Sequence, residues 1–263
     1  SAYVNQYDLL AGLKAGGTFL LNCKWSQADL DEKLPAAMKK YIADNKINFY
    51  TINATDIAEE IGLGNRTNMV MQSAFFTLAN VIPMEDAMEY QKEAVEKTYG
   101  KKGEKIVAMN NLAIEKGVDA LVKVEVPAAW AGVVESEAAA ATDEPEFITK
   151  VLKPMTRQEG DSLPVSTFVG REDGTFPMGT SAYEKRGIAV HVPEWQMENC
   201  IQCNQCSFVC PHAAIRPILV DEEEAKTAPE SFRTLKAQGK GFEALGYRMA
   251  VSPLDCTGCG NCA

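Results

Sequence analysis

The sequence lacks the features that would send a chain into or across a membrane. Its 263 residues contain no uninterrupted apolar run of about 18 residues, the length that a membrane helix needs. The start SAYVNQYDLLAGLK has no basic flank, apolar stretch or cleavage site of a secretory signal. We therefore expect a cytoplasmic protein that makes no contact with a membrane.

The sequence also lacks an excess of positive charge. Its net charge is −10, and no basic stripe with interleaved aromatic residues occurs. An extended phosphate backbone would be repelled on average, which argues against nucleic acid as a partner. No Ser-His-Asp or paired-carboxylate pattern is present, so the sequence assigns no catalytic residue. His191 and His212 are interpreted as structural.

Cysteine is present in an uneven distribution. Of the eight cysteines, Cys23 stands alone at the end of an expected strand and is interpreted as a small core residue. The other seven lie within the last 64 residues: Cys200, Cys203, Cys206, Cys210, Cys256, Cys259 and Cys262. In a cytosolic chain such clustering indicates metal ligation rather than disulfides.

The stretch CIQCNQCSFVCP, residues 200–211, has the C-x2-C-x2-C-x3-C-P spacing of bacterial ferredoxins. Three thiolates in a tight loop can reach three corners of one [4Fe-4S] cube, whereas the fourth lies beyond that cube and ligates a second cluster. Cys210 is therefore predicted to join Cys256, Cys259 and Cys262 of CTGCGNC in one complete ligand set. Gly258 and Gly260 suit close approach of the backbone to a cluster.

The other ligand set is incomplete within the sequence. Cys200, Cys203 and Cys206 need a fourth thiolate, which the pattern places three positions beyond Ala263. We therefore expect a truncated two-cluster domain, with an inserted segment from Asp221 to about Gly246. Apolar neighbours are expected to keep water from both clusters, namely Ile201, Phe208, Val209, Ala213, Ile215 and Ile218.

Two other classes of protein remain open at this point. A zinc-stabilised structural protein would use C-x2-C pairs, but three cysteines in a row at this spacing suit a tetrahedral ion poorly. A free-standing ferredoxin-like electron carrier with an accessory domain is the second alternative, and the incomplete motif disfavours it. Metal content separates iron-sulfur clusters from zinc.

The first part of the chain has the pattern of an α/β domain. TFLLNC, residues 18–23, and INFYTI, residues 47–52, are predicted strands, and residues 29–45 between them are a predicted helix. A strand-helix-strand unit favours a parallel sheet. Further helices are expected over 55–61, 67–80, 83–99 and 103–122, with possible short strands or helix ends at residues 106–110 and 121–126.

The middle of the chain is predicted to be irregular. VVESEAAAATD, residues 133–143, is small and acidic like a linker, and residues 150–193 carry glycine and proline too closely for a long helix. The sequence thus predicts three domains over 1–130, 131–193 and 194–263. Its fold class is α/β with a parallel sheet, followed by an irregular linker domain and a truncated α+β ferredoxin-like domain.

With the cysteines placed, the whole chain resembles a known family. AYVNQYDLLAGLKAGGTFLLNCKW, LGNRTNMVMQSAFF and MNNLAIEKGVDALVKVEVP are similar to the gamma-type domain of the pyruvate:ferredoxin (flavodoxin) oxidoreductases. DGTFPMGTSAYEKRGIAVHVPEW resembles their linker domain, named for Glu184, Lys185 and Arg186, and CIQCNQCSFVCPHAAIRP matches their ferredoxin domain.

The resemblance implies a role in a thiamine diphosphate enzyme that converts pyruvate and coenzyme A to acetyl-CoA and CO2. Electrons would pass singly through [4Fe-4S] clusters to ferredoxin or flavodoxin. The remaining domains would lie outside this chain, so the isolated chain is expected to be inactive and the whole enzyme a homodimer. Because the gamma-type domain helps to hold coenzyme A in the family, the polar residues Asn22, Lys24 and Asn110 near expected strand ends are the predicted contacts.

Overall fold

The computed structural model describes residues 2–134 and 143–262, and the chain folds as two compact units that divide after Asp143. Most of the predicted linker, residues 135–142, lies outside the described residues. Each unit is considered by itself. None of the helices in the described part of the chain has both the length and the apolar composition to span a bilayer.

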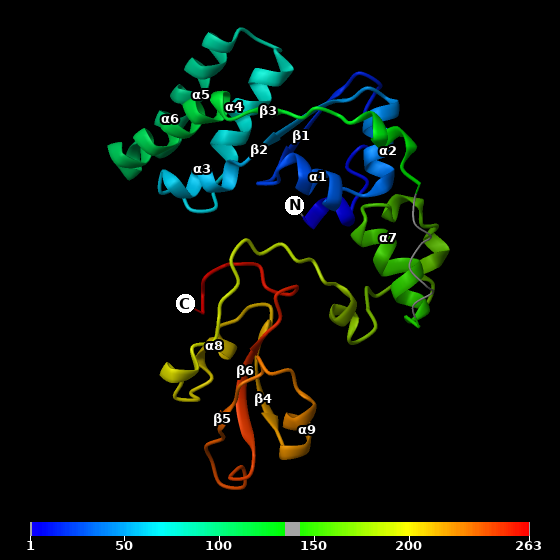
Figure 1. The fold of residues 1–263 in the computed structure, drawn as a ribbon, viewed down its shortest axis with the longest axis vertical. Coiled ribbons are helices and arrows are strands. Elements are labelled where there is room, and N and C mark those ends of the chain that lie inside the picture. Colours follow the sequence, from blue (N-terminus) through cyan, green and yellow to red (C-terminus); the bar gives the residue numbers. More distant parts are fainter. Residues whose placement is uncertain (1, 135–142, 263) are drawn as a thin grey trace. The chain divides into compact units, whose positions relative to one another are not determined.

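The first unit is a three-stranded sheet with helices on both faces (Figure 1). Its strands are β1 (Thr18–Asn22), β2 (Asn48–Ile52) and β3 (Val122–Lys123). Its α-helices are α1 (Gln27–Lys33), α2 (Ala36–Asp44), α3 (Ala54–Glu60), α4 (Asn68–Ala79), α5 (Met84–Tyr99) and α6 (Glu104–Asp119). Short 3-10 helices are η1 (Ala2–Asn5), η2 (Gly100–Lys102) and η3 (Ala128–Gly132).

The central pairing of this sheet is parallel, as the sequence predicts. β1 and β2 run in the same direction, with Thr18 opposite Asn48 and Asn22 opposite Ile52. β3 adds an antiparallel edge through only two residue pairs. Residues 106–110, interpreted as a short strand or a helix end, lie in the first half of α6 and not in a strand.

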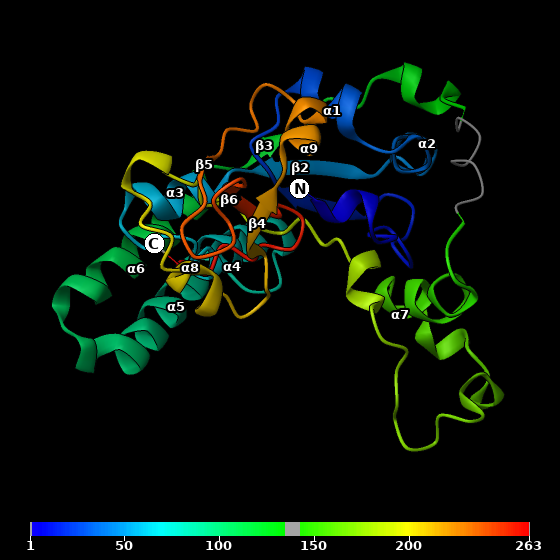
Figure 2. The ribbon, with the colours of Figure 1, turned by 90° about the horizontal axis from the view of Figure 1, so that it is seen from below.

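Alternation along the strands divides the interior of this unit into two cores. Phe49 and Leu21 point to the side of α1 and α2, whereas Ile52 and Leu20 pack with α3, α4 and α6 on the other side. Figure 2 shows β2 between these two groups of helices. A strand covered on both faces needs apolar residues on both, which explains the central FLL of β1 and the buried Phe49 and Ile52 of β2.

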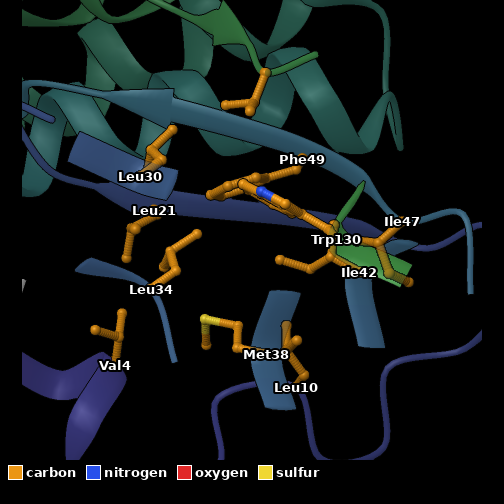
Figure 3. Packing of buried hydrophobic residues seen from close by; sticks show 11 residues of the cluster. Val4, Leu10, Leu21, Leu30, Leu34, Met38, Ile42, Ile47, Phe49 and Trp130 are labelled. Atoms are coloured by element: carbon orange, nitrogen blue, oxygen red, sulfur yellow. The ribbon is translucent and has the colours of Figure 1, made fainter. Parts of the chain in front are cut away.

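The single helix predicted over residues 29–45 is wrong, because the segment forms two helices. Leu34 takes an extended conformation at φ −73° and ψ 136°, and α2 begins after Pro35. A residue before proline is forced away from the helical region, so the break is local. Leu30, Leu34, Met38 and Ile42 nevertheless line one buried face beneath the sheet, together with Trp130 (Figure 3).

The second unit combines irregular chain with a small antiparallel sheet in the order β4-β6-β5. Its strands are β4 (Ile215–Val220), β5 (Leu235–Lys236) and β6 (Gly246–Val251), and its α-helices are α7 (Lys153–Thr156), α8 (Gln205–Phe208) and α9 (Glu222–Thr227). A π-helical turn, η4 (Ile148–Leu152), precedes α7. Single 3-10 turns are η5 (Gly160–Ser162), η6 (Val165–Phe168), η7 (Thr180–Tyr183) and η8 (Met197–Asn199). The irregular character expected for residues 150–193 is therefore confirmed.

Candidate metal centre

The first cysteine run is a tight loop held by two residues in left-handed conformations. Gln202 and Asn204 both have a φ of 59°, which costs an L-residue roughly 1–3 kcal/mol. Both side chains are anchored to the β5–β6 region. Gln202 Nε2 donates to Lys236 O at 2.8 Å, and Gln202 Oε1 accepts from Gln238 N at 2.9 Å. Asn204 Oδ1 accepts from the Tyr247 hydroxyl at 2.7 Å. These bonds offset the strain and fix where the cysteines point.

The thiols of the first three cysteines gather near Tyr247. Cys200 and Cys206 pack against the small core of Ile215, Ala237, Tyr247 and Met249. Burial, and then the negative charge of the Cys200, Cys206 and Cys203 sulfurs, raises the pKa of Tyr247 to about 12. A phenol with so high a pKa remains a hydrogen-bond donor to Asn204 at neutral pH.

The other four cysteines surround one cavity of about 200 Å³. Its wall contains Cys210, Cys256, Cys259 and Cys262, and the rest is formed by residues 191–193, 211–212, 214–215, 257–258 and 260–261. Burial, and then the nearby sulfurs of Cys210, Cys256 and Cys259, raise the pKa of Cys262. The structure thus brings together the four cysteines that the spacing groups into one ligand set. We call these four the second set, and Cys200, Cys203 and Cys206 the first set.

Backbone amides point at two sulfurs of this second set. Ala214 N donates to Cys210 Sγ at 3.3 Å, and Gly258 N donates to Cys256 Sγ at 3.4 Å. Burial alone would raise the pKa of the Cys210 thiol, but amides of residues 212–215 outweigh it, so that the pKa is lowered. Amide donors of this kind stabilise a thiolate and tune the potential of an iron-sulfur cluster.

The donor set is of the kind that an iron-sulfur cluster takes. Four cysteines border one cavity, and backbone amides donate to two of their sulfurs. All eight cysteines are free of disulfides. Cysteine thiolates are the ligands of [4Fe-4S] clusters, and hydrogen bonds to their sulfurs tune the potential.

The expected apolar shielding of the clusters is wrong for most of the residues named for it. Ile201, Phe208, Val209 and Ile218 have exposed fractions of 73%, 83%, 48% and 37%, and Ala213 is exposed as well. Only Ile215 is buried. Besides Ile215, the buried residues that pack against the cysteines are Ala237, Tyr247 and Met249, and buried Ala214 lines the cavity.

The residues predicted to contact coenzyme A make separate contacts in the described part of the chain, and no hydrogen bond there joins one of them to another. Asn22 Oδ1 accepts from Ala54 N at 3.0 Å, at the end of β1. Asn110 is buried within α6 and donates to Ile106 O at 2.8 Å. Lys24 lies exposed in the loop after β1. Their role stays a prediction.

The remaining sequence interpretations concern single residues. Cys23 is half-buried, packs against the core beneath the sheet, and has its pKa raised by burial. It is therefore an unreactive core thiol. His212 lines the cavity of the second set, and so does His191 from the segment before it. The sequence did not reveal the contact of Lys185 with Asp255, because 70 positions separate the two residues.

Comparison with known protein families divides the chain into three parts. Residues 1–120 match the family described as pyruvate ferredoxin/flavodoxin oxidoreductase. Residues 134–189 match the EKR family, described as a domain of unknown function, and residues 199–263 match the 4Fe-4S dicluster domain.

Individual relatives align along the whole chain. It is 61% identical over 262 residues to the pyruvate-flavodoxin oxidoreductase of Enterobacter agglomerans, covering 100% of this chain and 22% of the relative. It is 57% identical to the pyruvate:ferredoxin oxidoreductase of Moorella thermoacetica over the same shares. Identity to the mitochondrial pyruvate dehydrogenase [NADP(+)] of Euglena gracilis is 42%, over 99% of this chain and 14% of the relative. The chain spans about a fifth of the length of the first two relatives.

Proposed function

This chain carries the pyruvate ferredoxin/flavodoxin oxidoreductase domain and the 4Fe-4S dicluster domain, and on that premise we propose that it is the electron-relay and coenzyme A-associated segment of such an enzyme. The whole protein would convert pyruvate and coenzyme A to acetyl-CoA and CO2 with thiamine diphosphate bound outside this segment. Ferredoxin or flavodoxin would accept the electrons. The isolated segment would be inactive, and the whole enzyme would be a cytoplasmic homodimer.

The observation that carries this proposal is the grouping of Cys210 with Cys256, Cys259 and Cys262 around one cavity. These four thiolates would hold one [4Fe-4S] cluster, and Cys200, Cys203 and Cys206 would supply three ligands to another. When bound, such a cluster takes up and gives back one electron at a time. Ala214 and Gly258 would keep their amides directed at the ligand sulfurs and thereby favour the reduced state.

The proposed ligand role also favours a cytoplasmic location. Cysteines that hold a cluster have to be reduced when it is loaded, whereas an oxidising compartment would pair them. The protein would thus be made and loaded where thiol reductants keep the ligands available.

The first experiment measures iron and acid-labile sulfide in protein purified without oxygen, together with EPR of the dithionite-reduced sample. About four irons per filled ligand set are expected, with a cubane signal. Zinc in place of iron after strictly anaerobic reconstitution would support the zinc-stabilised structural protein and refute the relay.

Single cysteine substitutions then test the ligand sets. Cys259→Ser is expected to remove the signal of the Cys210 set, and Cys203→Ser that of the first set. Cys23→Ser, in the core beneath the sheet, is the control and should leave both signals intact. If Cys259→Ser leaves the signals unchanged, the ligand assignment fails.

The association with coenzyme A is tested at Lys24, the exposed member of the predicted group. Lys24→Met is expected to weaken coenzyme A binding to the whole enzyme several-fold in a calorimetric titration, because a cation near phosphate is lost. Lys14→Met is the matched control on another loop. Equal affinities for the two variants would remove Lys24 from the site.

The alternative function, a free-standing electron carrier, gives a different result in the same titration. Such a carrier would transfer electrons to flavodoxin and would not bind coenzyme A.

A further inference from the structure

The segment Glu184–Pro193 runs along the second cysteine loop without regular secondary structure. Gly187 N donates to Leu254 O at 2.9 Å, and a Cβ built at Gly187 would lie 3.3 Å from Leu254 Cδ2. Its first six residues belong to the match with the domain of unknown function. The segment and the loop therefore meet through the backbone as well as through side chains.

Lys185 joins this segment to the turn that leads into Cys256. Its Nζ lies 2.6 Å from Asp255 Oδ2, and the same oxygen accepts from Ser252 Oγ at 2.7 Å. Asp255 N and Cys256 N both donate to Ser252 O, at 3.2 and 3.1 Å. Asp255 is thus held by Lys185 on one side and by Ser252 on the other, directly before Cys256, a proposed cluster ligand.

The far end of the segment forms a wall of the cavity. His191, Val192 and Pro193 line it together with the four cysteines. A Cβ built at Gly258 would lie 3.3 Å from His191 O and 3.6 Å from Ala189 Cα, so the loop and the segment are in contact and a side chain at Gly258 would push them slightly apart. Without this wall the cavity would open towards solvent on that side.

We propose that Glu184–Pro193 is a strap that shapes the Cys256–Cys262 loop and limits access to its cluster, with Lys185 as the positioning residue that anchors it. This inference rests on the proposed function, because it assumes a cluster on Cys210, Cys256, Cys259 and Cys262. The proposal assigns a structural role to residues 184–189, which form the end of the match with the domain of unknown function. Opening of the strap would set how fast water and chelators reach the iron.

The test compares the rate at which the anaerobic holoprotein loses iron to a ferrous chelator, with EPR to identify the cluster that is lost. Lys185→Met removes the charge and keeps the stem of the side chain, and about two- to five-fold faster loss from the second cluster is expected for a half-exposed ion pair. Lys185→Arg keeps the cation and should restore the original rate.

Lys153→Met is the matched control. Lys153 pairs with Glu144 in the same unit, and the exposed fractions of that pair, 39% and 18%, nearly equal the 39% and 19% of Lys185 and Asp255. The control should lose iron at the original rate. An unchanged rate in Lys185→Met, or an equal acceleration in Lys153→Met, would overturn the strap.

Two glycines in the loop provide a second test that does not depend on the ion pair. Gly258 and Gly260 have φ angles of 69° and 79°, so alanine strains both, but only Gly258 faces the strap; Gly260 has open space around it. Gly258→Ala is expected to lose iron faster than Gly260→Ala. Equal rates would show that backbone strain alone acts and would contradict the contact.

Failure of the strap and failure of the proposed function give different results. If the unsubstituted protein holds no iron on the second set, the function fails before any variant is compared. If it holds a cluster and Lys185→Met loses iron at the rate of Lys153→Met, the strap fails and the relay stands.

Discussion

The hydroxyl of Tyr247 in β6 donates a hydrogen bond to Asn204 Oδ1, 2.7 Å away, in the middle of the first cysteine loop. Asn204 has a φ of 59°, and 43 positions separate it from Tyr247. The small sheet thus holds a strained residue between Cys203 and Cys206. Loop geometry here depends on a side chain that the cysteine spacing does not reveal.

Tyr247→Phe is expected to loosen the first cysteine loop and leave the second set intact. Loss of one hydrogen bond costs about 0.5–1.5 kcal/mol, and a left-handed Asn204 loses the bond that offsets its strain. Iron held by the first set should fall, as measured by EPR and iron content. Tyr183→Phe, at a tyrosine with a 40% exposed fraction in the same unit, is the control. Equal iron content in both variants would contradict this role.

Gly117→Ala is expected to destabilise the first unit, although alanine favours an isolated helix. A Cβ at Gly117 would lie 2.5 Å from Val70 O and 3.0 Å from Ser73 Cβ, where α6 crosses α4. The helices have to separate, which also stretches the 2.6 Å hydrogen bond from Ser73 Oγ to Ile114 O. Overpacking of this kind costs about 1–3 kcal/mol, measured as a lower urea midpoint.

Gly132→Ala provides the control for that substitution. A Cβ at Gly132 meets nothing within 4 Å, and its φ is not in the left-handed region. Its effect should stay within about 0.5 kcal/mol. A midpoint for Gly117→Ala at or above that of Gly132→Ala would show that the helices adjust freely.

The start of α1 is expected to lose stability in acid. Hydrogen bonds from Lys33, and then from Ser26, hold the pKa of Asp29 well below its usual range. A lowered pKa in the folded state stabilises the fold above the unfolded value of about 3.9 and does so less as the pH falls below it. Asp29→Asn should therefore flatten the decline of the urea midpoint below about pH 4. A decline as steep as in the unsubstituted chain would exclude Asp29 as its source.

Much of the first unit can be predicted from periodicity, and its main error has a physical cause. Leu30, Leu34, Met38 and Ile42 keep helical spacing across the break at Pro35, because both helices pack on the same core. Spacing alone therefore indicates one helix. The proline, which forces Leu34 into an extended conformation, was the available signal for two.

At the candidate metal centre, the cysteine spacing predicts which thiols lie close together. It does not predict which residues hold the cysteine loops in place. The grouping follows from the geometry of a cube and needs only local sequence. The contacts of Tyr247 with Asn204 and of Lys185 with Asp255 join distant positions and leave no local pattern. The wrong shielding residues have a similar origin, since hydropathy identifies Phe208 as apolar but not the direction in which it points.

Trp130 closes the core beneath the sheet, and its removal is expected to be the costliest of these substitutions. It has an exposed fraction of 3%, its ring lies 6.5 Å from that of Phe49, and its Nε1 donates to Asp31 Oδ1 at 2.7 Å. Trp130→Ala should lower the free energy of unfolding of the first unit by about 3–5 kcal/mol, because a buried aromatic ring leaves a cavity.

Trp130→Phe separates the contribution of volume from that of the hydrogen bond. Phenylalanine keeps most of the packing against Phe49 and loses only the bond to Asp31. Because Asp31 is exposed, water can replace that bond, so a smaller loss of about 1–2 kcal/mol is expected. Trp25→Ala, at a partly buried ring near Lys33, is the control for loss of a tryptophan. If Trp25→Ala lowers the urea midpoint as much as Trp130→Ala does, the core does not depend on closure by Trp130.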